Sequence, residues 1–259
     1  MPGCAMLTWR LWRALRNPDE DDPLFERMQT QSIDLPGQRY LRPLTPIYHV
    51  FAFFIPVVVV VIAPIALVVA ANVMGGLIAF NIMSAIQRER NQRTYDLLAL
   101  TPIGLGAVNW LIAAACTERL NAIDRLSQFR TLAIITMILL MFYLLRGGAL
   151  ASIAVIALLI ALNLDAIQTL IVGCLSGMLA QEFGDVPFVA LAIFAFVQII
   201  AVYLPVTAAG ILLFDILRRL QSTVLDTDSL TIITVLVLLF VLRELVIRLM
   251  WRELERRLL

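Results

Sequence analysis

The chain has 259 residues, of which 61% are hydrophobic and only 15% are charged, and its net charge is +1. Its mean hydropathy of +0.91 and its apolar content, well above the roughly 45–50% of soluble domains, exclude a soluble fold. All 20 basic residues are arginine, so the chain lacks the lysine with which the phosphate-binding loop of P-loop ATPases reaches its nucleotide. Any ATP hydrolysis linked to this chain therefore has to occur on another chain.

The first expected element is an amphipathic helix over residues 6–16. Its apolar residues share one helical face and its arginines the other: Leu7, Leu11, Trp12 and Leu15 against Arg10, Arg13 and Arg16. Trp9 and Trp12 suit the headgroup region of a bilayer, so we expect this helix to lie in the membrane interface. The alternative is a helix packed on the protein's own cytoplasmic side. A polar linker with several prolines follows, and residues 1–46 together are expected to form a cytoplasmic N-terminal region.

Residues 47–86 form a continuous apolar region. A single helix of that length would measure about 60 Å, twice the hydrocarbon thickness of about 30 Å. We therefore expect two helices, with the turn at Asn72 and the Gly75-Gly76 pair or else at Pro64. Arginines precede and follow the region, which places both of its flanks in the cytoplasm if it is a hairpin.

Residues 87–104 combine a charge cluster, a short amphipathic segment and a Thr-Pro stop. Glu89 lies four residues before Arg93, which is the favourable order for an ion pair on a helix. Thr94 can cap a short helix, and Pro102 disfavours helical geometry at the residue before it. The pattern indicates a docking element for a soluble partner. A basic loop that only fixes the topology is the alternative.

The same residues resemble the signature of type-2 ABC exporter permeases, in which a charged cluster leads into a run of Thr-x-x-Leu-Leu-x-x-Thr-Pro. The two parts stand here as Arg88-Glu89-Arg90 and Thr94-Tyr95-Asp96-Leu97-Leu98-Ala99-Leu100-Thr101-Pro102-Ile103. In that family the segment is a coupling helix that sits in a groove of a cytoplasmic ATPase. The resemblance implies that a cytoplasmic ABC ATPase and a second permease copy or homologue are partners. It also implies partner-coupling roles for Arg88, Glu89, Arg90, Arg93, Thr94, Tyr95, Asp96, Leu97, Leu98, Thr101 and Pro102.

The next two segments are too short or too polar to cross a bilayer. Residues 103–116 are apolar but number only 14, fewer than the roughly 20 that a span needs, and are expected to be re-entrant or interfacial. Residues 118–130 intersperse apolar and charged side chains in the manner of a surface helix.

Further spans are expected over residues 131–146, 149–181, 186–214 and 230–242. Asn163 and Asp165 interrupt the second of these, so it is either one broken helix, giving six spans, or two short ones, giving seven. The arginines of residues 248–257 favour a cytoplasmic C-terminus and thus an even number. We therefore expect an all-α, multi-pass protein of the cell membrane with about six transmembrane helices in residues 47–259 and both termini in the cytoplasm.

Some polar and small residues inside the apolar segments are candidates for a role. Gly173 and Gly177 form a GxxxG pair, which permits close helix contact within the chain or between two copies. Asn163, Asp165 and Gln168 form a polar break at membrane depth, where buried carboxylates are often functional, or at its edge, where they would merely be interfacial. Arg243 and Glu244, with Arg248 one turn later, are expected to be a neutralised group at a helix end with snorkelling side chains.

The sequence contains no pattern typical of a metal or catalytic site. His49 is the only histidine, and the three cysteines form no CxxC pair, so neither a metal nor a cofactor is expected. HExxH, GxSxG and paired-aspartate motifs do not occur, and no catalytic residue or nucleic-acid partner is expected. We expect a non-enzymatic permease subunit of an ABC exporter, powered by a partner ATPase. The second hypothesis is a non-transporting structural or assembly subunit of a larger membrane complex that retains the permease fold.

Overall fold

The fold is described from a computed structural model. The described residues are 7–16, 56–92, 95, 105–124, 126–128, 130, 131, 134, 135, 138, 149–184, 186–220 and 227–258. The linker of residues 17–46, most of the expected coupling segment and most of the span expected over residues 131–146 lie outside them.

The described part of the chain is helical, with turns and no strand, which confirms the all-α prediction. Its elements are α1 (Leu7–Arg16), α5 (Pro56–Asn91), α7 (Leu105–Arg119), α9 (Ala149–Ala180), α10 (Phe188–Phe196), the π-helix η2 (Val197–Tyr203), α11 (Leu204–Leu220) and α12 (Thr227–Leu258). Among the described residues, three stretches are long and apolar enough to cross a membrane: Ile65–Asn91, Ile156–Ala180 and Phe188–Ile216. These three stretches indicate a membrane protein.

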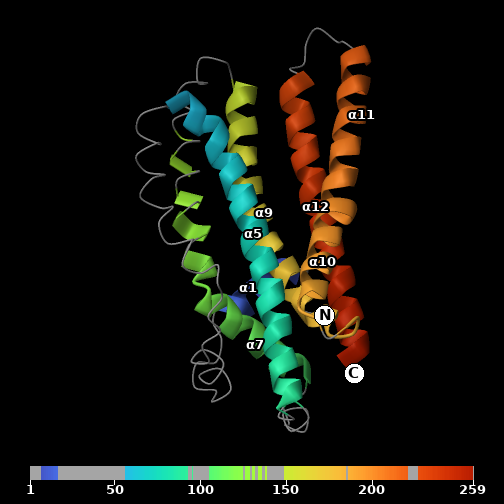
Figure 1. The fold of residues 1–259 in the computed structure, drawn as a ribbon. Coiled ribbons are helices and arrows are strands. Elements are labelled where there is room, and N and C mark those ends of the chain that lie inside the picture. Colours follow the sequence, from blue (N-terminus) through green and yellow to red (C-terminus); the bar gives the residue numbers. More distant parts are fainter. Residues whose placement is uncertain are drawn as a thin grey trace.

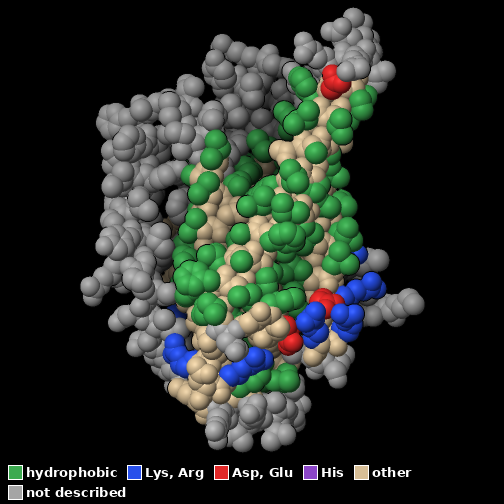
Figure 2. Space-filling view, turned by 45° about the vertical axis from the view of Figure 1, so that its right-hand side comes forward, with side chains coloured by type: hydrophobic (Ala, Val, Ile, Leu, Met, Phe, Trp, Pro, Cys, Tyr) green, Lys and Arg blue, Asp and Glu red, His purple; other side chains and the backbone are tan. Residues whose placement is uncertain are grey.

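The long helices lie side by side as an elongated bundle in which α9 packs against both α5 and α12 (Figure 1). The C-terminal ends of α5, α9 and α12 lie together with α1 and α7 at one end of the bundle. We call this the arginine-rich end, because it carries Arg10, Arg13, Arg16, Arg88, Arg90, Arg119, Arg248, Arg252, Arg256 and Arg257. Figure 2 shows the same division, with apolar side chains over the shaft of the bundle, the basic side chains and most acidic ones at its lower end, and one acidic side chain at its upper end. Such a distribution is typical of helices that cross a bilayer and emerge at an aqueous surface.

The apolar region that begins at residue 47 does not turn at its glycines. The helix α5 runs without a break for 36 residues, through Pro64, Asn72, Gly75 and Gly76, so the prediction of two helices with a turn at either place was wrong. The glycines serve packing instead: a Cβ on Gly75 would lie 2.7 Å from Cζ of Phe194, closer than real Cβ atoms approach. At about 1.5 Å per residue α5 measures about 54 Å, longer than a bilayer core, and its charged C-terminal turns extend beyond its apolar part.

The helix α9 passes Asn163 and Asp165 without a break. Asn163 Nδ2 donates to the backbone oxygen of Leu159 at 2.7 Å, and Thr169 Oγ1 donates to that of Asp165 at 2.7 Å. Polar side chains that bond within their own helix need no interruption of it. Of the two alternatives for this region, the structure therefore has the single helix.

The helix α1 places its apolar face against its own chain. Leu11, Trp12 and Leu15 are buried, and α1 contacts α7, α9 and α12. Trp12 is thus a packing residue and not a headgroup anchor, which supports the alternative of a helix packed on the protein itself. Trp9 is 50% exposed, and the arginines of α1 are exposed as well.

The helix α7 covers the short apolar segment and ends in a tight turn. With 15 residues it is shorter than a span, as expected. The chain turns at Asn121, whose φ of 47° is in the left-handed region, where asparagine is tolerated better than most residues. Described residues beyond the turn are helical again, with Leu126 buried and Ser127 exposed, in keeping with the expected surface helix.

Candidate functional site

The interior of the bundle holds a buried ion pair between α9 and α12. Arg243 is fully buried, and its Nη2 lies 3.0 Å from Oδ1 of Asp165. Its Nη1 also donates to the backbone oxygen of Asp165 at 2.9 Å. A buried arginine is tolerated when a carboxylate on a neighbouring element neutralises it. The expected pairing of Arg243 with Glu244 and the expected snorkelling were therefore wrong for Arg243, which points into the bundle.

A network of hydrogen bonds extends this ion pair to two further elements. Arg243 Nη2 donates to the hydroxyl of Tyr203 at 2.8 Å, and Nη1 donates to Oγ1 of Thr169. The Tyr203 oxygen also accepts from Asn72 Nδ2 at 2.8 Å, and the guanidinium lies 5.2 Å from the centre of the Tyr203 ring. The network thus links α5, α9, η2 and α12.

The sequence singled out Asp165 but missed three of its companions. Local patterns indicate a turn at Asn72, mark no role for Tyr203 and group Arg243 with Glu244 and Arg248. A usable signal did exist: a lone acidic residue in one apolar run and a basic residue at the end of another are expected to neutralise each other in a membrane interior. Of the other predicted polar residues, Asn163 bonds its own helix. Gln168 is 1% exposed, and its Nε2 has no hydrogen-bond partner among the described residues.

Tyr203 is the last residue of a π-helix, a rare local structure that is frequent at functional sites. Gln198, in the same π-helix, is 2% exposed, and neither atom of its amide has a hydrogen-bond partner in the described part of the chain. Arg243 Nε likewise lacks one. Buried polar atoms without hydrogen bonds cost folding free energy. A conformational change that gave Gln198 and Arg243 Nε hydrogen-bond partners would therefore be favourable at this site.

Glu244, next in sequence to Arg243, serves the N-terminus of α1. Its Oε1 accepts from the backbone nitrogen of Leu7 at 2.9 Å, and its Oε2 accepts from the hydroxyl of Thr8. A carboxylate at this position satisfies a free N–H group and faces the positive end of the helix dipole. Arg248 Nε lies 3.4 Å from Oε1 of the same carboxylate, as its spacing predicted. Neighbouring residues of α12 thus bind the bundle interior and α1.

The expected coupling segment begins at the arginine-rich end, where α5 ends. Glu89 of the charge cluster is fully buried. Arg90 is exposed but reaches the last turn of α9, where its Nη2 lies 3.3 Å from Oε1 of Gln181 and its Nη1 lies 3.4 Å from the backbone oxygen. Arg88 is half-buried. The other residues assigned to partner coupling lie outside the described residues: Arg93, Thr94, Asp96, Leu97, Leu98, Thr101 and Pro102.

Tyr95 lies inside the protein and is only 6% exposed. Its hydroxyl lies 2.9 Å from Oδ1 of Asn109 in α7 and 3.1 Å from Oε1 of Gln181, and the Arg90 guanidinium lies 5.2 Å from its ring centre. Burial raises the pKa of Tyr95 above 10.0, an effect that its hydrogen bond to Asn109 partly offsets. Its side chain therefore fastens the segment to Asn109 of α7 and to Gln181 after α9, and its partner-coupling role stays a prediction.

The GxxxG glycines of α9 face α5 of the same chain. A Cβ on Gly173 would lie 2.9 Å from Cα of Gly75, and one on Gly177 would lie 2.8 Å from the backbone oxygen of Ala79. The two helix backbones touch here, which only glycine permits.

No group of three or more histidine, cysteine, aspartate or glutamate side chains that could hold a metal ion occurs among the described residues. Comparisons with protein-family models, with curated proteins and with solved structures returned no match. The function therefore has to be inferred from the residues and contacts of the chain itself.

Proposed function

We propose that this chain is the membrane-spanning permease subunit of an ABC exporter, which moves a substrate across the membrane with ATP hydrolysed by a separate ATPase subunit. The observation that carries this proposal is the position of the described part of the segment 87–104, which is residues 87–92 and Tyr95. Its sequence resembles a coupling helix, it begins at the arginine-rich end, and its described part is fixed to the bundle by Arg90 and Tyr95.

These contacts supply a route by which force on the segment could reach the bundle. A partner pressing on residues 96–102 would press through Tyr95 on Asn109 of α7 and on Gln181 at the end of α9. The Asp165–Arg243 pair then links α9 to α12. Rigid helices joined at such points can tilt together between an inward-open and an outward-open arrangement.

The same proposal includes the topology. The arginine-rich end faces the cytoplasm, because arginine is enriched on the cytoplasmic side of membrane proteins. The chain crosses the cell membrane about six times with both termini in the cytoplasm, and a second copy or a homologue completes the transport pathway.

The direct test is capture of the ATPase. The chain is purified with an affinity tag in mild detergent, and co-purifying proteins are searched by mass spectrometry for a chain with a P-loop. Leu98→Asp should abolish co-purification while the chain stays folded, because the substitution puts a charge on the expected docking face. Phe183→Asp is the matched control, since Phe183 is 63% exposed at the same end of the bundle but outside the segment. Undiminished co-purification with Leu98→Asp would contradict docking through this segment.

A non-transporting structural or assembly subunit is the second candidate. It is favoured by the burial of the polar network, in which Arg243 and Asp165 face each other and are shielded from solvent. The capture experiment separates the two: stoichiometric co-purification with chains that lack a P-loop, together with protection of residues 96–102 from protease, would favour the structural role.

A further inference from the structure

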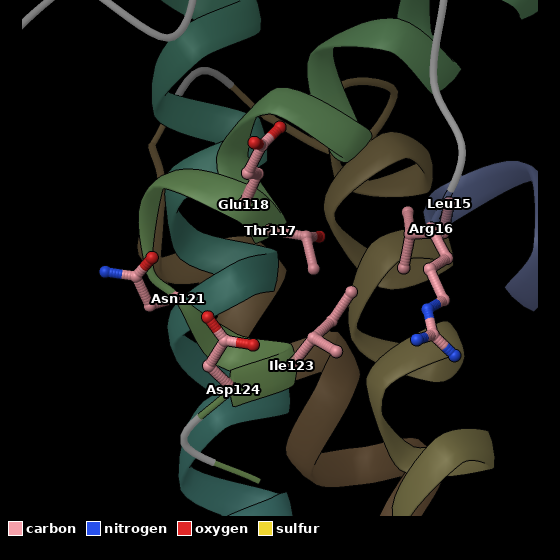
Figure 3. A pocket seen from close by; sticks show the side chains of 7 residues that line it. All are labelled: Leu15, Arg16, Thr117, Glu118, Asn121, Ile123 and Asp124. Atoms are coloured by element: carbon pink, nitrogen blue, oxygen red, sulfur yellow. The ribbon is translucent and has the colours of Figure 1, made fainter. Parts of the chain in front are cut away.

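A hollow of about 270 Å³ lies at the arginine-rich end between α1 and the turn that follows α7. Figure 3 shows Leu15 and Arg16 on one side of it and residues of α7 and the turn on the other. Its lining residues are Leu15, Arg16, Thr117, Glu118, Asn121, Ile123 and Asp124. Leu15 and Thr117 are buried and Ile123 is half-buried, whereas the four other side chains are exposed. The hollow thus has a largely apolar floor and a charged rim.

The rim combines both signs of charge. The side chain of Arg16 lies on one side of the hollow, and the side chains of Asp124 and Glu118 lie on the other. No ion pair within the described part of the chain involves Arg16 or Asp124, whereas Glu118 has a partner of its own. A purely anionic ligand would meet two carboxylates, and a purely cationic ligand would meet the arginine. A ligand with one anionic and one cationic group satisfies both sides.

The position of the hollow indicates where such a ligand comes from. It lies beside α1, whose exposed face carries Trp9, Arg10 and Arg13, residues typical of the headgroup region of a bilayer. The apolar floor of Leu15 and Ile123 suits a molecule that also has an apolar part.

We propose that this hollow binds the headgroup of a zwitterionic aminophospholipid, phosphatidylethanolamine, with the phosphate on Arg16 and the primary ammonium on Asp124. Arginine matches the geometry of a phosphate, and a primary ammonium donates hydrogen bonds to a carboxylate. The quaternary ammonium of phosphatidylcholine cannot donate them, so the site distinguishes the two lipids through Asp124. The proposal is independent of the ABC permease assignment.

The test compares lipids that differ only in the headgroup. The full chain is purified in detergent and stripped of lipid, and its thermal unfolding is followed while phosphatidylethanolamine, phosphatidylcholine or phosphatidylglycerol with identical acyl chains is added. Phosphatidylethanolamine should bind about tenfold more tightly than phosphatidylcholine, the difference that one charge-assisted hydrogen bond supplies. Asp124→Asn should remove this preference. Arg16→Gln should weaken the binding of both zwitterionic lipids, and Arg16→Lys should restore part of it.

The control is Arg13→Gln, an exposed arginine on the same helix that does not line the hollow; it should change nothing. Equal binding of all three lipids, or an unchanged preference with Asp124→Asn, would overturn the proposal. Glycerophosphoethanolamine, which has the same headgroup without acyl chains, shows whether the ligand is a membrane lipid or a free zwitterion. Binding of it as tight as that of the lipid would overturn the lipid assignment in favour of a free zwitterion.

Discussion

Replacement of Arg243 by methionine should destabilise the bundle more than replacement of any surface arginine of the chain. Methionine fills a similar volume but leaves the carboxylate of Asp165 buried and without its counter-charge. The substitution also removes the donors to Tyr203 and Thr169. The side chains of Arg243 and Asp165 are both buried, so bulk solvent does not replace these partners.

The size of the effect follows from these contacts. Removing one member of a buried ion pair costs about 3–5 kcal/mol, because the other member is left as an uncompensated charge. For a chain of this size about 1 kcal/mol shifts the midpoint of thermal unfolding by about 2–4 °C, so Arg243→Met should lower it by roughly 10 °C. The double variant Asp165→Leu/Arg243→Met removes both charges and should recover most of this loss.

Tryptophan fluorescence during heating of the purified chain in detergent measures these shifts. Arg256→Met is the matched control, because Arg256 lies on the same helix with a side chain that is 74% exposed. Its ion pair with Glu253 is exposed and screened by solvent, so its loss should shift the midpoint little. If Arg243→Met lowers the midpoint no more than Arg256→Met does, the reasoning about the buried pair is refuted. It is also refuted if the double variant lowers the midpoint by as much as Arg243→Met and Asp165→Leu, each measured alone, do together.

Three further predictions concern other contacts. Gly173→Ala should cost about 1–3 kcal/mol in thermal unfolding, whereas Gly184→Ala, whose Cβ has 3.5 Å to its nearest neighbour, should be neutral; equal effects would contradict the tight contact. Tyr95→Phe should cost about 1 kcal/mol. Because burial raises the pKa of Tyr95, its stabilising effect is complete below pH 10.0 and is lost as pH rises through its folded-state pKa. An absorbance titration of the folded protein should therefore lose a tyrosine that titrates above the ordinary range in this variant, and an unchanged titration would count against burial. Glu244→Gln should speed hydrogen exchange in the first turn of α1, with Glu255→Gln as the control, and equal exchange in both variants would argue against the cap.

The sequence was sufficient for the helical membrane class, because long apolar runs leave no other way to satisfy the backbone in a bilayer. It was also sufficient for the apolar face of α1 and for the short helix α7. It failed at Gly75 and Gly76, where local turn propensity was weaker than the gain from packing α5 closely on α9 and Phe194. That gain depends on residues roughly a hundred positions away, which no local pattern reveals.

The candidate site shows the same limit. Asp165 could be identified from its own surroundings, but its partner could not, because Arg243 stands beside a residue of opposite charge that offered a nearer explanation. The motif implies a partner-coupling role for Tyr95 but not its burial, which depends on Asn109 of α7 and on Gln181 in the turn after α9. Local patterns predict which residues are unusual; the three-dimensional arrangement decides what they bind.

The contact between Gly75 and Gly173 has a mechanical consequence for any motion of this bundle. Two backbones that touch leave no side-chain layer in which one helix could slide over the other, so α5 and α9 have to travel as a single body. Helices slide past each other where flexible side chains lie between them, and the interface of the α5–α9 pair with α12 has such a side chain. Arg243 of α12 crosses it, and its long side chain can keep its contact with Asp165 while the helices shift. The moving parts of this protein are therefore expected to be the α5–α9 pair and the α11–α12 pair, with Arg243 as the tether between them.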